Sequence, residues 1–188
     1  MNEKADLGAT GGAVWSDADE WQRRMSADGC VICRDGGPFD IIAETASCWV
    51  TAERDAPLPG YVCVVARTHV VEPYELPVAE QAAFWIDSMK VAGAVAEVVQ
   101  PVKTNYEIHG NTLPHLHLHL FPRHTDDPHV GGPVDPRKAS FRRSEADLAA
   151  LQTAIVAALA GAPTRSSTAV DASPRYSAPS GASGGSGV

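Results

Sequence analysis

The segment "PHLHLHLFPRH", residues 114–124, places three histidines in strict alternation with three leucines. Successive side chains of a β-strand point to opposite faces, so a strand would put His115, His117 and His119 on one face and the leucines on the other. Prolines at both ends of the run favour a strand, because proline is poorly tolerated inside a helix. The alternative is an ordinary half-buried strand whose polar face happens to carry histidine, although histidine has no special strand propensity. The segment therefore predicts a strand with a leucine face on the core and a histidine face toward solvent or a cleft.

Length and composition limit what this strand belongs to. With 188 residues, 44% of them hydrophobic, the chain is long enough for one domain with a substantial core. No apolar run approaches the ~20 residues of a membrane span, and the first residues lack the basic start and apolar centre of a signal peptide, so we expect a cytoplasmic protein without membrane contact. A net charge of −8 argues against binding long nucleic acid.

Basic residues gather after the histidine run, and they leave small anions as possible ligands. They account for five of the 15 Lys and Arg residues: Arg123, Arg137, Lys138, Arg142 and Arg143. Such a cluster is either solvated surface or a local anion-binding patch, and the sequence leaves both open.

Alternating apolar residues between turn signals predict further strands. The stretches 40–44, 47–53 and 61–67 are expected to form an antiparallel meander. Residues 103–109 follow as a fourth strand, and the histidine run is the fifth.

Helical spacing appears in three places. In residues 16–29, Ser16 is the expected N-cap of a short helix that ends at Gly29. The principal helix is expected within residues 77–101, where the apolar stripe is Trp85, Met89, Ala92, Ala96 and Val99. Ser144 is the expected cap of a last helix, whose stripe is Leu148, Leu151, Ile155 and Leu159.

The run from His115 to Phe121 resembles the His-x-His-x-His-x-x signature of the histidine triad (HIT) superfamily. The likeness covers about residues 28–125, with "HVV" after "YVCVVART" and the closing "FPRH" as further similarities. It implies an α+β fold, an antiparallel five-stranded meander sheet with a packed helix, which is usually dimerised. It also implies binding of a nucleotide, with cleavage or transfer at the α-phosphate.

With this resemblance the chain divides into four expected parts. Residues 1–27 form an N-terminal extension with a short helix, and residues 28–143 form the HIT-like domain. Residues 144–162 form a C-terminal helix. Residues 163–188 lack apolar residues to pack and are expected to be disordered.

By its place in the motif, His117 is the expected nucleophile, because neutral imidazole can attack phosphorus to form a nucleotidyl-histidine that water then hydrolyses. In the family a backbone carbonyl holds its other nitrogen. His119 is expected to contact the phosphate or protonate the leaving atom. Asn111 and Thr112 fall where the family's hydrolases tend to carry Gln and Ser that bind phosphate oxygens, and Asn105 is a further candidate. All three are also ordinary turn or strand residues.

The pair Cys30-x-x-Cys33 is compatible with a zinc knuckle or a redox pair. A thioredoxin-type pair needs a helix that starts at the first cysteine, whereas "RDGGP" turns the chain at once, so zinc is preferred. The other cysteines, Cys48 and Cys63, suit reduced thiols rather than a disulfide scaffold.

Several branches of the superfamily, the galactose-1-phosphate uridylyltransferase-like one among them, bind structural zinc with such a pair, a histidine after the third strand and the first triad histidine. The resemblance thus implies a zinc site made of Cys30, Cys33, His69 and His115. Two isolated thiols remain the alternative.

The expected function is a nucleotide-binding hydrolase that cleaves at the α-phosphate of a nucleotide conjugate, either a phosphoramidate or a dinucleoside polyphosphate. His119 favours hydrolase over nucleotidyltransferase, because the transferase branches tend to carry Gln there. A metal-dependent hydrolase with the histidines as ligands is a further alternative, although no acid lies within six residues after His119. A non-catalytic nucleotide-binding module is the third alternative.

Overall fold

The computed structural model describes residues 14–129 and 131–161, which form an α+β fold, as the sequence predicts. The main sheet is antiparallel, with five strands in the order β1-β2-β4-β6-β5. The strands are β1 (Ile41–Glu44), β2 (Cys48–Thr51), β4 (Val62–Ala66), β5 (Lys103–Glu107) and β6 (His117–Arg123). β6 is therefore inside the sheet, hydrogen bonded to β4 on one side and to β5 on the other.

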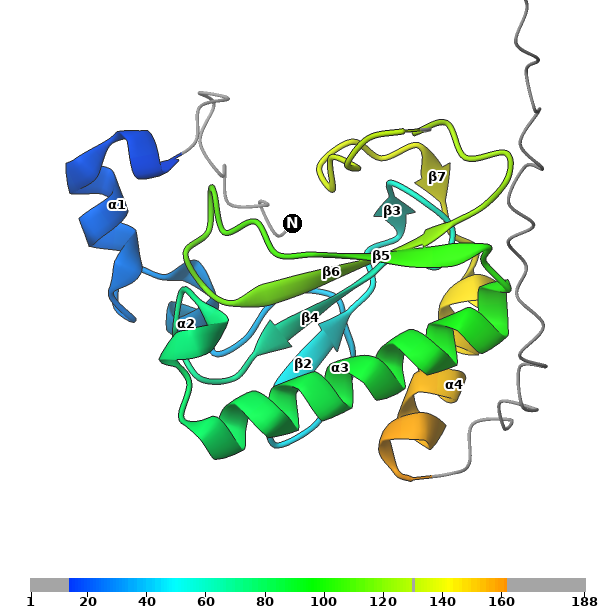
Figure 1. Ribbon diagram of the computed structural model, residues 1–188, viewed down its shortest axis with the longest axis horizontal. Coiled ribbons are helices and arrows are strands. Elements are labelled where there is room, and N and C mark those ends of the chain that lie inside the picture. The colour runs from blue at the N-terminus through cyan, green and yellow to red at the C-terminus, as the bar shows by residue number, and fades with distance from the viewer. Residues whose placement is uncertain (1–13, 130, 162–188) are drawn as a thin grey trace, which may run out of the picture.

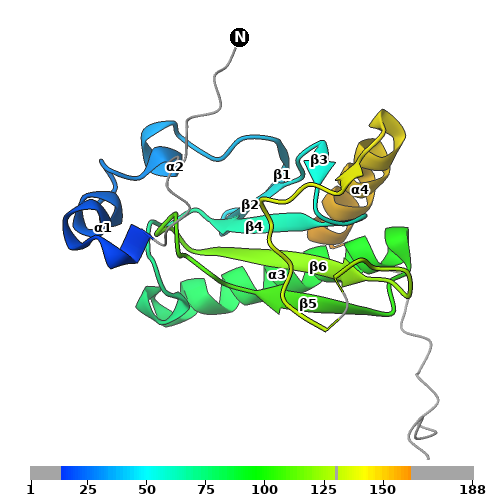
Figure 2. The ribbon, with the colours of Figure 1, turned by 90° about the horizontal axis from the view of Figure 1, so that it is seen from above.

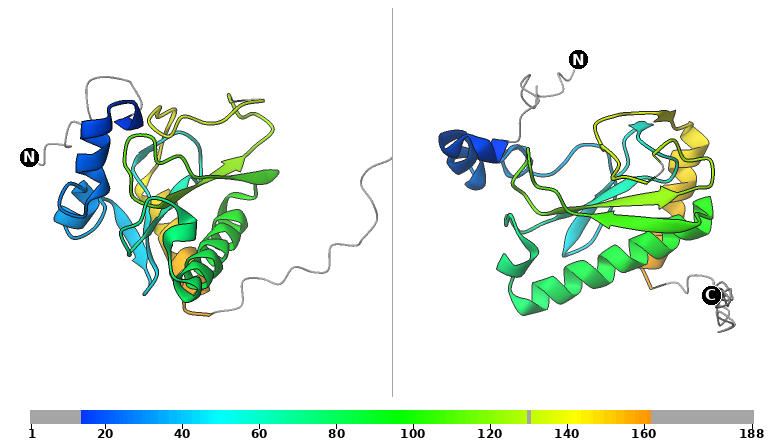
Figure 3. Two further views of the ribbon diagram at one scale, coloured as in Figure 1. Left: turned by 60° about the vertical axis from the view of Figure 1, so that its left-hand side comes forward. Right: turned by 45° about the horizontal axis from the view of Figure 1, so that its top comes forward.

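Helices cover one face of this sheet. The long helix α3 (Val78–Val99) and the helix α4 (Glu145–Leu159) lie along the same face, as Figures 1 and 2 show. Across the opposite face runs the segment after β6, which ends in a second, two-stranded sheet of β3 (Asp55–Ala56) and β7 (Phe141–Arg142) (Figure 3). The remaining elements are η1 (Val14–Ser16), α1 (Ala18–Met25), α2 (Val31–Arg34) and η2 (Pro73–Glu75).

The leucines of the histidine run form part of the core between the sheet and the helices. Leu118 and Leu120 are buried and lie directly opposite Val64 and Val62 of β4. Phe84 and other buried side chains of α3 pack on them from the helical layer. The period-2 pattern thus placed the leucine face correctly.

The histidine strand begins later than the sequence suggested, at His117 rather than at His115. Just before the strand, the Leu116 carbonyl accepts the N–H of Ala66 and the Leu116 N–H donates to the carbonyl of Val70. His115 therefore lies outside the strand as the structure has it, two residues before its start. Pro122 also lies within β6 rather than after it, and it fits there because the pairing with β4 ends at Leu120.

Two helix predictions need correction. The N-cap of α1 is Asp17, not Ser16, because the Asp17 carboxylate accepts the backbone N–H groups of Asp19 and Glu20. That helix ends at Met25, four residues before Gly29.

For α3 the apolar stripe was wrong at Trp85 and Met89, whereas Ala92 is buried as expected. Trp85 and Met89 are 38% and 44% exposed, whereas Phe84, Val91 and Val95 are buried. The helix is apolar on most of its circumference, so spacing alone could not select the core side.

The last helix agrees with prediction. Ser144 caps α4 through a reciprocal capping box with Asp147, and Leu151 and Ile155 are buried. The expected disordered tail, residues 163–188, lies outside the described residues. Among the described residues, no helix has the length and apolarity to cross a bilayer.

Most of the basic residues after β6 have structural partners. Buried Arg143 donates hydrogen bonds to the backbone carbonyls of Glu53 and Tyr61. The ion pairs of the others are Arg123 with Asp127, Arg137 with Asp135, and Arg142 with Asp55. Arg143 and Arg123 therefore hold neighbouring backbone, whereas the ion pairs of Arg137 and Arg142 lie on the surface.

We predict that Gly60→Ala destabilises the fold. Gly60 has a φ of 74°, and a Cβ there would lie 2.7 Å from Val99 Cγ2 at the end of α3. The unfolding free energy should fall by more than about 1 kcal/mol in urea titrations. Gly93→Ala is the matched control: Gly93 lies inside α3 with open space around its Cα, so it should stabilise by up to about 1 kcal/mol. Equal stability of the two variants would contradict this account.

Candidate functional site

The sheet face opposite α3 carries a row of polar side chains around β6. His119 lies directly opposite Cys63 of β4 and Glu107 of β5, and His117 lies opposite Val65. Directly opposed residues of antiparallel strands point to the same face with Cβ atoms about 5 Å apart. The side chains of β4, β5 and β6 that oppose one another therefore form one continuous surface.

The ring of His117 is held in one tautomer. Its Nδ1 lies 2.6 Å from the backbone carbonyl oxygen of His115, so Nδ1 carries the proton and donates it to that oxygen. This leaves the lone pair on Nε2. Burial lowers the pKa of His117, so the imidazole is neutral at pH 7. A neutral ring with an available Nε2 lone pair has the properties of a nucleophile.

His119 is buried in this face, with 6% of its surface exposed. Its ring lies 4.8 Å from that of His117, centroid to centroid, and Nδ1 is 2.9 Å from the hydroxyl oxygen of Tyr61. Burial raises the pKa of Tyr61 and lowers that of His119 to about 3. The tyrosine thus keeps its proton and can donate it to Nδ1, which leaves the His119 ring proton on Nε2 as a hydrogen-bond donor.

Sequence reasoning missed three residues beside His119: Tyr61, Glu107 and His109. The ring of His109 is 5.4 Å from that of His119, and its Nε2 is 3.0 Å from Glu107 Oε2. Asn105 Nδ2 donates to the other carboxylate oxygen of Glu107 at 3.3 Å. The period-2 alternation in "KTNYEIH" was the available signal, because it puts these β5 side chains on one face. The alternation could not predict whether these β5 side chains would lie on the histidine face or on the leucine face of β6.

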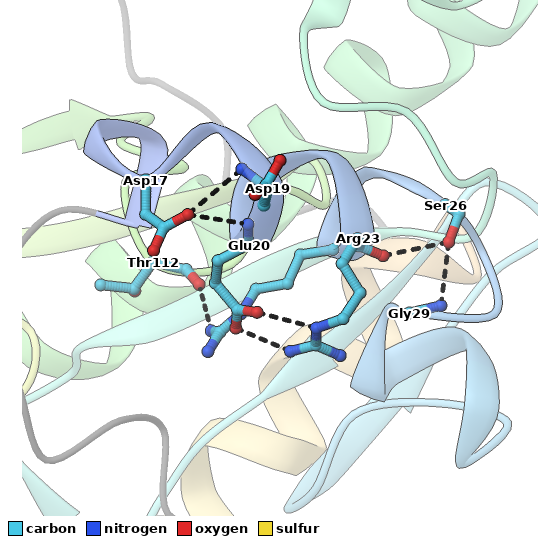
Figure 4. A network of polar contacts seen from close by, with 8 residues as sticks. Asp17, Asp19, Glu20, Arg23, Ser26, Gly29 and Thr112 are labelled. Atoms are coloured by element: carbon cyan, nitrogen blue, oxygen red, sulfur yellow. Dashed lines mark hydrogen bonds and ion pairs between the residues drawn. The ribbon is translucent and has the colours of Figure 1, made fainter.

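Asn111 and Thr112 lie in the connection between β5 and β6, where contacts from the N-terminal segment hold their backbone. The Asn111 carbonyl accepts the N–H of Val14 at 2.9 Å. The Thr112 carbonyl accepts Arg24 Nη1 at 2.9 Å, and Glu20 in turn bonds Arg24. Figure 4 labels Thr112 and Glu20 of this network. The described hydrogen bonds of these two residues run through the backbone, so their expected contact with phosphate stays a prediction.

A second cluster lies next to the triad, at the end of the sheet where β6 begins. Cys30 is the N-cap of the one-turn helix α2, Cys33 lies within that helix, and His69 follows β4. With buried His115 they offer four ligand atoms that lie within 4.8 Å of one another. The structure thus brings together the four residues that the sequence suggested as a zinc site.

The geometry of this cluster fits a tetrahedral metal. Zn–S bonds of about 2.3 Å and Zn–N bonds of about 2.0 Å separate sulfur from nitrogen by about 3.5 Å. Cys30 Sγ lies 3.4 Å from His115 Nδ1, and Cys33 Sγ lies 3.3 Å from His69 Nδ1. The two Nδ1 atoms are 3.2 Å apart.

The tautomers of the two imidazoles point to the same conclusion. Nε2 of His115 donates to the carbonyl of Ala66 and Nε2 of His69 to that of Met25, each at 2.7 Å. Both Nδ1 lone pairs therefore face each other, an arrangement that a cation between them would stabilise. Burial also lowers the pKa of His115 to about 4, which keeps its ring in the neutral, metal-binding form.

Comparison with known proteins agrees with this geometry. The family model described as HIT domain matches residues 36–126. A histidine triad protein from Marinobacter aquaeolei VT8 is 27% identical, with a TM-score of 0.55, and the match covers 65% of this chain and 90% of that one. A histidine triad protein from Bradyrhizobium japonicum is 25% identical, with a TM-score of 0.55 and coverages of 61% and 86%.

A third structure, a histidine triad protein from Sinorhizobium meliloti 1021, has 24% identity and a TM-score of 0.53 over 61% of this chain and 85% of its own, and shows the fold alone. No curated protein matches the sequence.

We predict that His119 makes stability depend on pH. Its pKa is about 3 when folded and near 6.5 when unfolded, so between these values it takes up a proton only on unfolding. Its contribution is fully present above pH 6.5 and is lost as the pH falls toward 3, at about 1.4 kcal/mol per pH unit. His119→Gln should reduce this slope in urea titrations.

The direct measurement is an NMR titration of the imidazole. Because burial is the main cause of the shift, Tyr61→Phe should leave the pKa of His119 well below 6.5. A His119 ring that titrated near 6.5 in the folded wild-type protein would contradict the assignment.

Proposed function

Because this chain carries a HIT domain over residues 36–126, we propose that it is a nucleotide hydrolase acting at the α-phosphate of a nucleotide conjugate, a phosphoramidate or a dinucleoside polyphosphate. The observation that carries the proposal is the hydrogen bond between His117 Nδ1 and the His115 carbonyl. It leaves a neutral imidazole with its Nε2 lone pair beside a second, buried histidine.

The proposed reaction has two steps. Nε2 of His117 attacks the α-phosphorus, a P–N bond forms, and the bond to the leaving group breaks with its electron pair on the leaving atom. Nε2–H of His119 donates to a phosphate oxygen or to the leaving atom as negative charge develops. Water then attacks the phosphorus, releases a nucleoside monophosphate and returns the electron pair to His117.

Apolar side chains next to His117 pack α2 onto the sheet. Val65 lies opposite His117, and Trp49 of β2 lies opposite Val65, which extends the histidine face toward β1. Ile32 of α2 packs against the same apolar cluster. Val65 and Ile32 are buried, and Arg67 lies 4.7 Å from the centroid of the Trp49 ring, so this cluster borders the site of His117 as packed core. The proposal leaves the identity of the base open.

The separation of the two histidine sets favours this mechanism over a catalytic metal. In the part of the chain that the structure describes, the metal-ligand cluster takes only His115 from the triad. His117 and His119 are outside it and have the carbonyl and the tyrosine as partners. A nucleotidyltransferase would share the first step and differ in the acceptor.

We further propose that Cys30, Cys33, His69 and His115 hold a structural zinc ion. Soft thiolates with imidazoles are the donor set that zinc prefers, and four protein ligands leave no position for a substrate. When bound, zinc would act as a structural crosslink that ties α2 and the segment after β4 to the start of β6. The reaction itself is assigned to His117.

A homodimer is also proposed for this chain. Val78, Ile86 and Met89 of α3 are 81%, 57% and 44% exposed, and β5 is an edge strand of the sheet. Exposed apolar side chains beside an unpaired strand edge support association with a second copy.

For zinc, we expect about one ion per purified chain by elemental analysis. Cys33→Ser should lower both the zinc content and the melting temperature, because it removes one ligand of a closed site. Cys63→Ser is the matched control: Cys63 lies outside the cluster, so its zinc content should equal that of the wild type. Metal-free protein with unchanged stability would refute the site.

For catalysis, His117→Asn should lower kcat by a factor of at least about 1000 while nucleotide binding and fold persist, because the nucleophile acts mainly in the transition state. Acid quench of wild-type enzyme with labelled substrate should leave label on His117, detectable by mass spectrometry. A variant with near-wild-type kcat would exclude this nucleophile. Activity that is lost on chelation while circular dichroism stays native would favour a catalytic metal instead.

A further inference from the structure

The β5–β6 loop, residues 108–116, joins two strands of the sheet without regular secondary structure of its own. It carries Asn111 and Thr112, the two residues expected to contact phosphate. The pairing of β5 with β6 ends at Glu107 and His119, so strand hydrogen bonds do not fix the loop. A loop that presents polar side chains to a substrate needs its backbone held by other parts of the fold.

Packing holds the loop beside the part of the sheet that carries His117. Leu113 packs against the apolar cluster that contains buried Val65. Val65 in turn lies directly opposite His117 in the register of β4 and β6. Thr112 precedes Leu113, so its backbone enters this region at the point where the packing begins.

A side chain from α1 holds the backbone of Thr112. Nη1 of Arg24 donates to the Thr112 carbonyl oxygen at 2.9 Å, and Nε of the same guanidinium donates to Glu20 Oε1 at 2.6 Å. Only 17% of the Arg24 side chain is exposed. Because a peptide group is planar, a fixed Thr112 carbonyl also fixes the peptide plane between Thr112 and Leu113.

The segment that carries Arg24 is itself attached at both ends. The N–H of Val14 donates to the Asn111 carbonyl at 2.9 Å. At the other end, Nε2 of His69 donates to the carbonyl of Met25, the residue after Arg24, at 2.7 Å. Residues 14–25 thus connect the β5–β6 loop to the Cys30 and His69 cluster, which gives the Arg24 side chain a fixed base.

The charge of Arg24 is balanced by its neighbour. Hydrogen bonds from Arg23 and Arg24 lower the pKa of Glu20 to about 2, so this carboxylate is ionised at pH 7. Arg24 is therefore half of an ion pair and points a donor at a backbone carbonyl. This arrangement favours a geometric role over direct attraction of a phosphate.

We propose that Arg24 is a positioning residue, which acts through the Thr112 carbonyl to hold the β5–β6 loop in the conformation that presents Asn111 and Thr112 to a nucleotide phosphate. The inference rests on the proposed function and adds α1 to its site. Arg24 makes no contact with the substrate. Without its bond the Thr112–Leu113 peptide gains rotational freedom, so the loss falls on phosphate contacts rather than on the binding of the nucleoside.

The test compares AMP with adenosine, which lacks the phosphate, by titration calorimetry. Arg24→Gln should weaken AMP binding about fivefold and change adenosine binding by less than about twofold. Arg23→Gln is the matched control, because Arg23 also bonds Glu20 but is 57% exposed, and its described side-chain bonds go to Glu20 alone. Both affinities of that variant should stay within about twofold of wild type.

A second variant separates geometry from charge. Glu20→Gln removes the negative charge and keeps an oxygen that can accept from Arg24. If Arg24 attracted phosphate by its charge, this variant would bind AMP more tightly than wild type does. A positioning role predicts AMP binding that is equal to wild type or weaker, so tighter binding would overturn it.

Hydrogen–deuterium exchange measures the loop without any nucleotide. In Arg24→Gln, amides of residues 108–116 should exchange about tenfold faster, whereas those of α4 should exchange as in wild type and show that the fold persists. Unchanged loop exchange, or equal weakening of AMP and adenosine, would refute the role of Arg24. Wild-type protein that bound AMP no more tightly than adenosine would instead contradict the proposed nucleotide site, and the exchange rates would still decide whether Arg24 holds the loop.

Discussion

β6 lies between β4 and β5, and its side chains alternate between the two faces of the sheet. This alternation is the constraint on which the rest of the structure depends. Because side chains of a strand alternate with a period of two, fixing the leucines under α3 fixes His117 and His119 on the other face. A register slip of one residue would bury the imidazoles under the helix and expose the leucines. The core packing of one face therefore positions the chemistry of the other.

His115 joins the two functional parts of this face. Its side chain belongs to the Cys30 and Cys33 cluster, while its backbone carbonyl holds the tautomer of His117. His115 lies two residues before the start of β6. From this position its side chain contacts the cysteines while its backbone carbonyl accepts the proton of His117 Nδ1. Any metal bound by the cluster would thus fix the carbonyl that orients the proposed nucleophile, a direct physical link between a structural site and a reactive one.

The face opposite α3 also has two chemically different directions. Toward β1 the neighbours of the triad are apolar, with Val65 and Trp49 in register with His117. Toward β5 they are polar, from Glu107 to Lys103.

The sequence by itself determined the positions of the main strands, the cap of α4 and the split between leucine and histidine faces, since these follow from local periodicity and capping. The α+β class was implied by its resemblance to a known family. The sequence also contained the four ligands of the metal cluster, through the resemblance of their spacing to a known family. Only the tertiary structure decided that Glu107 and His109 lie beside His119, and that Phe84 rather than Trp85 faces the core. The physical reason is that periodicity tells which residues share a face, whereas the partner of that face is set by pairing and packing between segments distant in sequence.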